Sequence, residues 1–321
     1  MVKKLIIATS NELNPYKNLA YEEYLFNTLP KDTFILYLWC NDNTVVIGLN
    51  QNAYRECNIV GLKEGGGNLV RRKTGGGAVY HDKHNLNFTF IAEKENYDVK
   101  RQLDIIMLGL NNLGILSEKS GRNDLVTSDG RKFSGNAFLE RDGKALHHGT
   151  ILIDTDITKI MKYLTISEVK LIAKGVSSVA SRVVNLKSIN PEITVNSVKQ
   201  SFIETTKTIM KEAEVIVTDI SLADSGIMDK LIKEYSNSKF ILGSKLKYSI
   251  SCDKRFTWGT ATLDFNIRKG IIEDIAIYTD SLDIGIAERI VHALKGKSLD
   301  YQGEGEELAV IDILNLLKLG G

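Results

Sequence analysis

This sequence of 321 residues has few cysteines, little net charge and no long apolar runs, and each of these features excludes some classes of protein. The three cysteines, Cys40, Cys57 and Cys252, are widely spaced and odd in number, which leaves no disulfide framework and no CxxC metal pair. The formal net charge is +1, so no broad basic field indicates nucleic acid, and we expect no nucleic-acid partner.

Extended apolar segments are missing as well. No stretch of the sequence approaches the ~18 apolar residues that a membrane span requires. Residues 1–10 hold only a short apolar run, where a signal peptide needs roughly 7–15 apolar residues. We therefore expect a cytoplasmic protein with no membrane partner, and a reducing compartment fits the unpaired cysteines.

Length and composition favour two ordinary globular domains. Hydrophobic residues make up 43% of the chain and charged residues 25%, as in other soluble globular proteins. A chain of this length exceeds what one hydrophobic core usually holds. Residues 236–247 have a polar character, so we place a linker there and expect a domain of residues 1–243 and an accessory domain of residues 244–321.

Local patterns predict the main helices and strands. Asn14 and Pro15 are a plausible cap and first turn for a helix that runs to about Thr28. Apolar residues at helical spacing predict another helix over residues 98–113. Strand, turn, strand and helix patterns in the last part of the chain predict a small α+β unit. We expect buried strands at residues 5–8, 34–39 and 44–48.

Extended segments separated by Asp-Gly pairs predict an antiparallel meander over residues 124–153, because Asp-Gly between extended runs is a strong hairpin signal. Alternation along its middle strand would place small residues around Lys132 and leave room for a ligand. The expected face of Lys132 also carries Ser134, Asn136 and Phe138, and the opposite face carries Phe133, Gly135, Ala137 and Leu139.

The most informative stretch is residues 69–90, in which Arg71 and Arg72 precede a run of three glycines, residues 75–77. Consecutive glycines suit a backbone that approaches a ligand closely, with bare N–H groups facing an anion and guanidinium groups holding its charge. A lone Gly-Gly-Gly is also typical of a flexible loop, but the arginines before it and the strand pattern after it favour the anion site. The Gly-Lys-Ser/Thr ending of a Walker A loop is absent.

Residues 71–82, Arg-Arg-Lys-Thr-Gly-Gly-Gly-Ala-Val-Tyr-His-Asp, closely resemble the signature of the lipoate–protein ligase A family. Several ordered motifs are more specific than one, and the resemblance covers nearly the whole chain, including a smaller C-terminal domain. The further motifs lie, in the family's order, at residues 121–126, 131–137 and 147–152, and a family loop is resembled at residues 174–178 and 181–186.

The resemblance implies the biotin/lipoate ligase fold, an α+β architecture. We expect a large domain with a mixed, mostly antiparallel sheet flanked by helices, followed by a small C-terminal α+β domain. The implied activity is ATP-dependent activation of lipoate to lipoyl-AMP, followed by transfer of the lipoyl group to a lysine of an acceptor protein. The expected acceptors are the lipoyl domains of 2-oxoacid dehydrogenases and the H protein of glycine cleavage.

The resemblance also implies roles for individual residues. Lys132 matches the family's catalytic lysine and would contact both ATP and lipoate. The implied ATP and adenylate site consists of Arg72, Gly77, Ala78, Val79 and Tyr80. The implied lipoate site consists of Glu22, Trp39, Gly75, Gly76 and His148.

The chemistry explains why a lysine is needed. The carboxylate of lipoate and the α-phosphate of ATP are both anions, and a fixed ammonium between them offsets their repulsion and sets the line of attack. Asp124 could orient Lys132, or hold Mg²⁺ together with phosphate oxygens, or be a plain hairpin-edge residue. The histidines lack the spacing of a zinc site, so a polar pocket wall is the favoured interpretation for His81, His147 and His148.

Other functions remain open at this point. A lipoyl- or octanoyltransferase of the same fold would use a cysteine nucleophile and no ATP, but Cys40 and Cys57 lie outside the lysine meander. A biotin ligase would share the fold, although the arginine and glycine spacing fits lipoate better. A catalytically silent binder of lipoate or of acceptor domains would not need the lysine, the glycines and the arginine.

Overall fold

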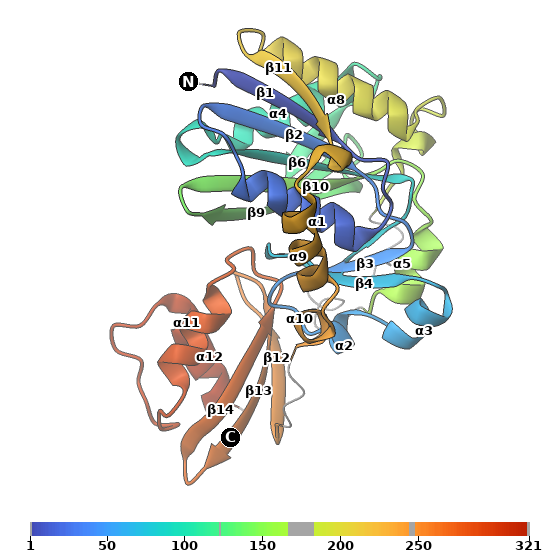
Figure 1. Ribbon diagram of the computed structural model, residues 1–321. Coiled ribbons are helices and arrows are strands. Elements are labelled where there is room, and N and C mark those ends of the chain that lie inside the picture. The colour runs from blue at the N-terminus through green and yellow to red at the C-terminus, as the bar shows by residue number, and fades with distance from the viewer. Residues whose placement is uncertain (1, 122, 166–182, 244–247, 320–321) are drawn as a thin grey trace.

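The computed structural model describes residues 2–121, 123–165, 183–243 and 248–319. Figure 1 shows a larger N-terminal part and a smaller C-terminal part. The family loop expected at residues 174–178 lies outside the described residues, and so do residues 244–247, next to the expected domain boundary. Within the described ranges, no helix combines the length and apolar character that crossing a membrane requires.

An eight-stranded sheet forms the centre of the larger part. Both neighbours of β1 run parallel to it, and the other pairs are antiparallel, which confirms the expected mixed, mostly antiparallel sheet. In spatial order the strands are β11 (Glu214–Asp219), β1 (Lys4–Thr9), β2 (Thr33–Trp39), β6 (Asn85–Glu93), β10 (Lys144–Leu152), β9 (Lys132–Arg141), β8 (Asp124–Thr127) and β7 (Ser117–Ser120).

Helices cover both faces of this sheet (Figure 1). On one face, α4 (Val99–Asn111) and α8 (Val195–Ile209) pack over a core in which Phe88 is fully buried. On the other face, α1 (Pro15–Asn27) packs against α9 (Ser225–Tyr235) over a second core. Burial of each large apolar side chain contributes roughly 1.5–3 kcal/mol, so these two cores hold the central sheet in place.

Helix α1 begins where the sequence predicts. The Asn14 side chain accepts hydrogen bonds from the backbone N–H groups of Tyr16 at 2.9 Å and Lys17 at 3.3 Å. This satisfies donors that have no partner in the first turn of a helix. Pro15 fits the first helical position because no backbone donor is needed there. The helix ends at its C-cap, Thr28, as expected.

A second, three-stranded sheet carries the glycine loop, which we define as residues 72–78. Its strand order is β4 (Asn68–Arg71), β3 (Thr44–Ile47) and β5 (Val79–His81). The glycine loop connects β4 to β5, so the sheet fixes both ends of the loop. Three short helices complete this region: α2 (Ala53–Glu56), α3 (Ile59–Glu64) and α5 (Ile157–Tyr163).

The segment expected as a polar linker is partly helical. Helix α10 (Ser238–Leu242) lies inside residues 236–247, and its Ile241 is buried. The backbone carbonyls of Phe240 and Ile241 accept hydrogen bonds from the buried Arg71 side chain. Residues 238–242 of the segment expected as a linker therefore form a short helix, whose apolar residues pack against the larger part.

The C-terminal part is a small α+β unit with its own core, as expected. Its antiparallel sheet has the order β12 (Ile250–Arg255), β13 (Thr260–Arg268) and β14 (Ile271–Thr279). Helices α11 (Ile286–Leu294) and α12 (Leu308–Leu319) supply the rest of the core, in which Leu263 and Ile290 are fully buried.

Hydrogen bonds join the two parts near the end of β14. The Thr279 N–H donates to the Asn50 carbonyl at 2.9 Å, and the Asn50 side chain donates to the Ile284 carbonyl at 2.8 Å. Further along the contact, Arg55 donates to the hydroxyl of Ser251 at 2.7 Å. The C-terminal part therefore meets the loop that follows β3, close to the glycine loop.

Candidate active site

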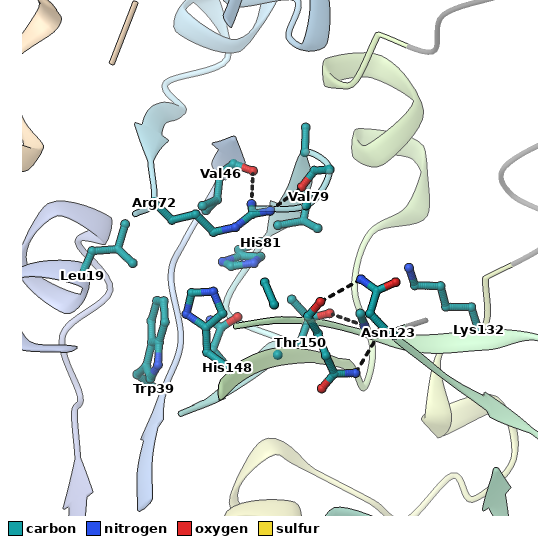
Figure 2. Close-up of a pocket in the computed structure, with 18 residues that line it drawn as sticks. Leu19, Trp39, Val46, Arg72, Val79, His81, Asn123, Lys132, His148 and Thr150 are labelled. Carbon is teal, nitrogen blue, oxygen red and sulfur yellow. Dashed lines mark hydrogen bonds between the residues drawn. The ribbon is translucent and has the colours of Figure 1, made fainter. Parts of the chain in front are cut away.

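A pocket lies between the glycine loop and strands β6, β9 and β10. Figure 2 shows Leu19 and Trp39 toward one end of it and Lys132 toward the other. Most of the predicted site residues line this pocket: Trp39, Arg72, Gly76, Gly77, Ala78, Val79, Lys132 and His148. Residues far apart in the sequence therefore meet at one place, as the motifs predicted.

Four predicted site residues do not line the pocket: Glu22, Gly75, Tyr80 and Asp124. The Tyr80 side chain is 2% exposed and packs in the core behind the small sheet, with its ring 5.8 Å from that of Tyr163. Its hydroxyl donates to the Asn43 side chain at 3.1 Å. A contact between Tyr80 and an adenylate would therefore use its backbone rather than its ring.

Lys132 reaches the pocket because of a β-bulge between β8 and β9. Val126 pairs with Lys132, whereas the residue before Val126 pairs with Ser134, so Phe133 is an extra residue in β9. The bulge brings Lys132 over Gly135, where an added Cβ would lie 3.1 Å from Lys132 Nζ. The prediction that these two residues occupy opposite faces was wrong, because strict alternation does not hold across a bulge.

Asp124 orients the Lys132 ammonium. Their side chains form an ion pair with 2.7 Å between Asp124 Oδ1 and Lys132 Nζ. Lys132 is 38% exposed and Asp124 31%, so solvent screens the pair and it contributes little to stability. Of the three sequence-based interpretations of Asp124, this arrangement fits the first, a carboxylate that fixes the direction of the lysine side chain.

A buried polar chain supports the wall beside Lys132. His147 Nε2 lies 2.8 Å from Asn136 Oδ1, and His147 Nδ1 lies 2.9 Å from Gln102 Oε1. Burial lowers the pKa of His147 to about 3, so the ring is neutral. Asn136 in turn donates to the Asn123 carbonyl at 3.0 Å and accepts a bond from the Asn123 side chain at 2.7 Å. His147 thus lies behind the pocket wall and supports it.

The Arg72 guanidinium supports the glycine loop from inside. It donates to the carbonyls of Gly75 at 2.6 Å, Gly77 at 2.8 Å and Val46 at 3.2 Å, and to the Thr74 hydroxyl at 3.0 Å. Burial lowers the pKa of Arg72 to about 10, which leaves it charged at neutral pH. Among the described residues no carboxylate lies within ion-pair distance of it, so its charge raises the potential beside the loop.

Arg71 points in a different direction and holds backbone segments together. Its Nη1 donates to the carbonyls of Gly48 at 3.0 Å, Leu49 at 2.8 Å and Gln51 at 2.6 Å. Its Nη2 donates to the Ile241 carbonyl in α10 at 2.6 Å. Arg71 does not line the pocket. It anchors the loop that contacts the C-terminal part.

The three consecutive glycines differ in what an added side chain would meet. A Cβ on Gly75 would lie 2.4 Å from the Ser281 carbonyl oxygen, so backbone of the C-terminal part occupies the space of a side chain. Gly76 has a φ of +87°, which favours glycine, and its N–H donates to the same Ser281 carbonyl at 3.0 Å. Gly77 faces open space. In this arrangement the close approach at Gly75 comes from protein backbone.

A hydrogen-bonded chain runs along the inner wall. Trp39 Nε1 donates to the Thr89 hydroxyl at 3.1 Å, and that hydroxyl donates to Glu22 Oε1 at 2.6 Å. His148 Nδ1 lies 2.9 Å from the same Glu22 oxygen, and His148 Nε2 lies 2.9 Å from the Thr74 hydroxyl. Glu22 therefore acts from behind His148, and the chain connects the Trp39 end of the pocket to the glycine loop.

The cysteines are poorly suited to nucleophilic catalysis. Burial raises the pKa of the Cys40 and Cys57 thiols to about 11 and also raises the pKa of Cys252. A thiol attacks as the thiolate, which is scarce at neutral pH when the pKa is raised. None of the three lines the pocket. This geometry disfavours the cysteine-dependent transferase.

Sequence reasoning did not single out several residues of the pocket wall. Asn87 and Thr150 lie on the pocket side of β6 and β10, and Val46 lies on β3. A usable signal was present on β6, because the polar Asn85, Asn87 and Thr89 alternate with apolar residues along a buried strand. Polar residues at alternate positions of a buried strand indicate a polar cavity on that face.

Two family models together cover most of the chain. One, described as the lipoyl protein ligase A/B catalytic domain, matches residues 14–207. The other, described as the bacterial lipoate protein ligase C-terminus, matches residues 245–316. Among curated proteins, lipoate-protein ligase A from Bdellovibrio bacteriovorus is 38% identical over 318 residues, which is 97% of this chain and 93% of that protein.

The solved structures that match this chain also include lipoate–protein ligases. P. falciparum LipL1 in complex with lipoate matches with a TM-score of 0.82 and 30% identity, over 98% of each chain. A bi-partite lipoate protein ligase from Thermoplasma acidophilum, described with its E2 lipoyl domain, matches with a TM-score of 0.66 and 26% identity, over 78% of this chain and 100% of that one. A lipoate-protein ligase A bound with ATP matches with a TM-score of 0.64 and 25% identity, over 76% of this chain and 99% of that one. The chain therefore belongs to the lipoate–protein ligase A family and is a lipoate–protein ligase.

Proposed function

We propose that this pocket is where lipoate and ATP react to give lipoyl-AMP, and that Lys132 is the catalytic residue. The observation that carries the proposal is the position of the Lys132 ammonium, held by Asp124 at the wall of a pocket that the glycine loop also lines. One cation there can serve two anionic reactants, and the relatives solved with lipoate and with ATP support the pairing of these ligands.

In the first step, a carboxylate oxygen of lipoate attacks the α-phosphorus of ATP. The bond between the α-phosphorus and the bridging oxygen breaks, and pyrophosphate leaves. Charge develops on the oxygens of the α-phosphoryl group, and a fixed ammonium stabilises that charge without reorganisation. The Asp124 contact restricts the Lys132 rotamers, so both reactants meet the ammonium in one geometry.

The glycine loop is the proposed nucleotide side of the pocket. Gly77, Ala78 and Val79 line it, and the Tyr80 backbone continues the same segment. Arg72 would act on phosphate mainly through its charge and by holding the loop carbonyls, since most of its N–H groups are already bonded to the protein. Gly75 and Gly76 would meet ligand only where Ser281 does not cover them.

The residues present also fit a magnesium ion that accompanies ATP. Mg²⁺ is usually held by one or two carboxylates together with substrate phosphates and water. Asp124, 31% exposed beside Lys132, is the carboxylate that would hold it. When bound, the ion would supply additional positive charge for the phosphates. This role is compatible with the orienting contact, because a carboxylate has two oxygens.

The opposite end of the pocket is the proposed acyl site. Trp39 and His148 line it, and Glu22 fixes the His148 ring from behind. An acyl chain that extends from Lys132 toward Trp39 would be enclosed by these side chains. The charged reaction centre would then lie at the Lys132 end of the pocket and the apolar tail of the substrate at the Trp39 end. This arrangement suits an acid with a long apolar chain.

In the second step, the amine of an acceptor lysine attacks the lipoyl carbonyl carbon, loses a proton, and displaces AMP. The proposed acceptors are lipoyl domains of 2-oxoacid dehydrogenases and the glycine cleavage H protein, acting in the cytoplasm. The Thermoplasma ligase described with its E2 lipoyl domain supports this class of partner. We assign catalysis to residues 1–243 and an accessory role to residues 244–321.

Pyrophosphate release by purified protein with ATP and Mg²⁺ tests the proposal. Lipoate, octanoate and biotin are supplied in separate reactions. We expect release with lipoate and none with biotin, since the solved relatives that this chain resembles over most of its length are lipoate ligases. Release with none of the three acids would overturn the proposed function, and acyl transfer without ATP would favour the cysteine-dependent transferase.

A further inference from the structure

His81 is a buried histidine of the pocket that the reaction described above does not use. It ends β5, is 3% exposed and lines the pocket. Its ring lies edge-on to Trp39, with 6.2 Å between the ring centroids. In Figure 2 it lies between Arg72 and His148, well away from Lys132. It is therefore on the acyl side of the pocket.

Neighbouring side chains fix which nitrogen of His81 carries the proton. Asn41 Nδ2 lies 3.2 Å from His81 Nδ1. The orientation of the Asn41 amide is set because its Oδ1 accepts a bond from Asn18 Nδ2 at 3.0 Å. Asn18 is itself oriented, since its Nδ2 donates to the backbone carbonyls of Glu12 at 2.9 Å and Cys40 at 2.8 Å, which can only accept. Asn41 therefore donates to His81 Nδ1, which must be unprotonated.

The remaining proton is on Nε2. Burial, reinforced by the nearby charge of Arg72, lowers the pKa of His81 to about 3, so the ring is neutral at physiological pH. A neutral imidazole with an unprotonated Nδ1 carries its hydrogen on Nε2. Across the described part of the chain, His81 Nε2 has no hydrogen-bond partner. The Nδ2 atom of Asn87, on the same pocket wall, likewise has no partner there.

Burying a hydrogen-bond donor without an acceptor costs about 1–3 kcal/mol. Such a donor in the wall of a ligand pocket therefore indicates that the ligand supplies the acceptor. In the proposed reaction the carboxylate of the substrate lies at the Lys132 end, where ATP must also reach it. The group that meets His81 is then the distal end of the acyl chain. In lipoate that end is a ring with two sulfur atoms, which are weak acceptors, and in octanoate it is a hydrocarbon.

We propose that His81 is a specificity-determining residue, whose Nε2–H donates to a sulfur of the dithiolane ring and so favours lipoate over an unsubstituted acyl chain of the same length. The inference rests on the proposed function. Octanoate would leave the His81 donor buried and unpaired, whereas lipoate satisfies it in part. Because sulfur is a weak acceptor, we expect a preference of about fivefold rather than several hundredfold.

Two substitutions separate this role from a structural one. His81→Asn keeps an acceptor near the Nδ1 position for Asn41 but has no donor that reaches the Nε2 position. His81→Gln has the opposite effect, because its amide reaches the Nε2 position while the bond to Asn41 is lost. The measurement is the dissociation constant of each variant for lipoate and for octanoate, without ATP, on protein shown to be folded by its thermal transition.

We expect the parent and His81→Gln to bind lipoate about fivefold more tightly than octanoate, and His81→Asn to bind the two acids with nearly equal affinity. An unchanged preference in His81→Asn, or equal losses for both acids in both variants, would overturn the inference. Pyrophosphate release by the parent, measured in parallel, reports the proposed function by itself. If the parent releases pyrophosphate with lipoate but the preference does not depend on residue 81, only the specificity role fails.

Discussion

A single methyl group at Gly75 tests how the C-terminal part meets the glycine loop. Gly75→Ala adds a Cβ that would lie 2.4 Å from the Ser281 carbonyl oxygen and 2.9 Å from the Leu282 carbonyl oxygen. The φ of Gly75 is not in the left-handed region, so alanine is not strained in its backbone. Gly77→Ala is the matched control, because a Cβ there has nothing within 4 Å.

The distance to Ser281 gives the size of the expected destabilisation of the docked arrangement. Ordinary contacts between non-bonded atoms are about 3.5–4.0 Å, so the Ser281 backbone must move by about 1 Å. Overpacking of this kind costs about 1–3 kcal/mol. The displacement would also break the bond from the Gly76 N–H to the Ser281 carbonyl. The docked arrangement should therefore become roughly 5- to 150-fold less favoured relative to an undocked one.

Amide hydrogen exchange is the assay, because the Thr279 N–H donates to the Asn50 carbonyl across the contact between the two parts. We expect the Thr279 amide to exchange at least fivefold faster in Gly75→Ala than in the parent, with core amides of β6 unchanged. The Gly77→Ala variant should exchange like the parent. Parent-like exchange in a folded Gly75→Ala protein would refute the docking geometry described here.

Other predictions concern the loop arginine, the cysteines and a buried histidine. Arg72→Ala should weaken ATP binding at least tenfold, because charge-assisted bonds of about 1.5–3 kcal/mol hold the loop, and an unchanged dissociation constant in folded protein would contradict that role. Replacing Cys40, Cys57 and Cys252 together with serine should leave substantial ATP-dependent ligation per folded molecule, and a folded but inactive protein would favour the transferase. Burial lowers the pKa of His147 to about 3 in the folded protein, whereas a histidine of the unfolded chain has a pKa of about 6.5. Between these two pH values the unfolded chain binds one more proton than the folded protein. Stability should thus be lost as pH falls from about 6.5 toward 3, by up to about 1.4 kcal/mol per pH unit, and His147→Gln should show a shallower decline in urea unfolding.

The sequence predicted the regular elements well, because their signals are local. The Asn14 cap defines the start of α1, and the Asp142–Gly143 pair adopts positive φ values of 53° and 72° in the hairpin between β9 and β10. Which residues gather at the pocket was predicted from motifs rather than from periodicity. The helical stretch at residues 238–242 was missed, since a five-residue helix has too few residues to show a period.

Other features could not be predicted because they depend on distant parts of the chain. The face of Lys132 is set by the bulge at Phe133, and periodicity assumes that no bulge is present. Arg71 and Arg72 are adjacent and chemically identical, yet one holds the loop after β3 and the other holds the glycine loop. At Gly75 the close approach comes from Ser281, more than 200 positions later in the sequence.

The most direct test of the account is adenylate formation by Lys132→Ala. Lipoyl-AMP and pyrophosphate are measured with saturating ATP, Mg²⁺ and lipoate, on protein whose unfolding transition matches that of the parent. Lys144→Ala is the control, because Lys144 lies on the adjacent strand and its ammonium donates to the carbonyls of Phe26 and Asn27, away from the pocket. We predict that Lys132→Ala forms lipoyl-AMP at least ~100-fold more slowly than the parent, while Lys144→Ala retains the parent rate. A folded Lys132→Ala protein that forms lipoyl-AMP at nearly the parent rate would contradict the central claim.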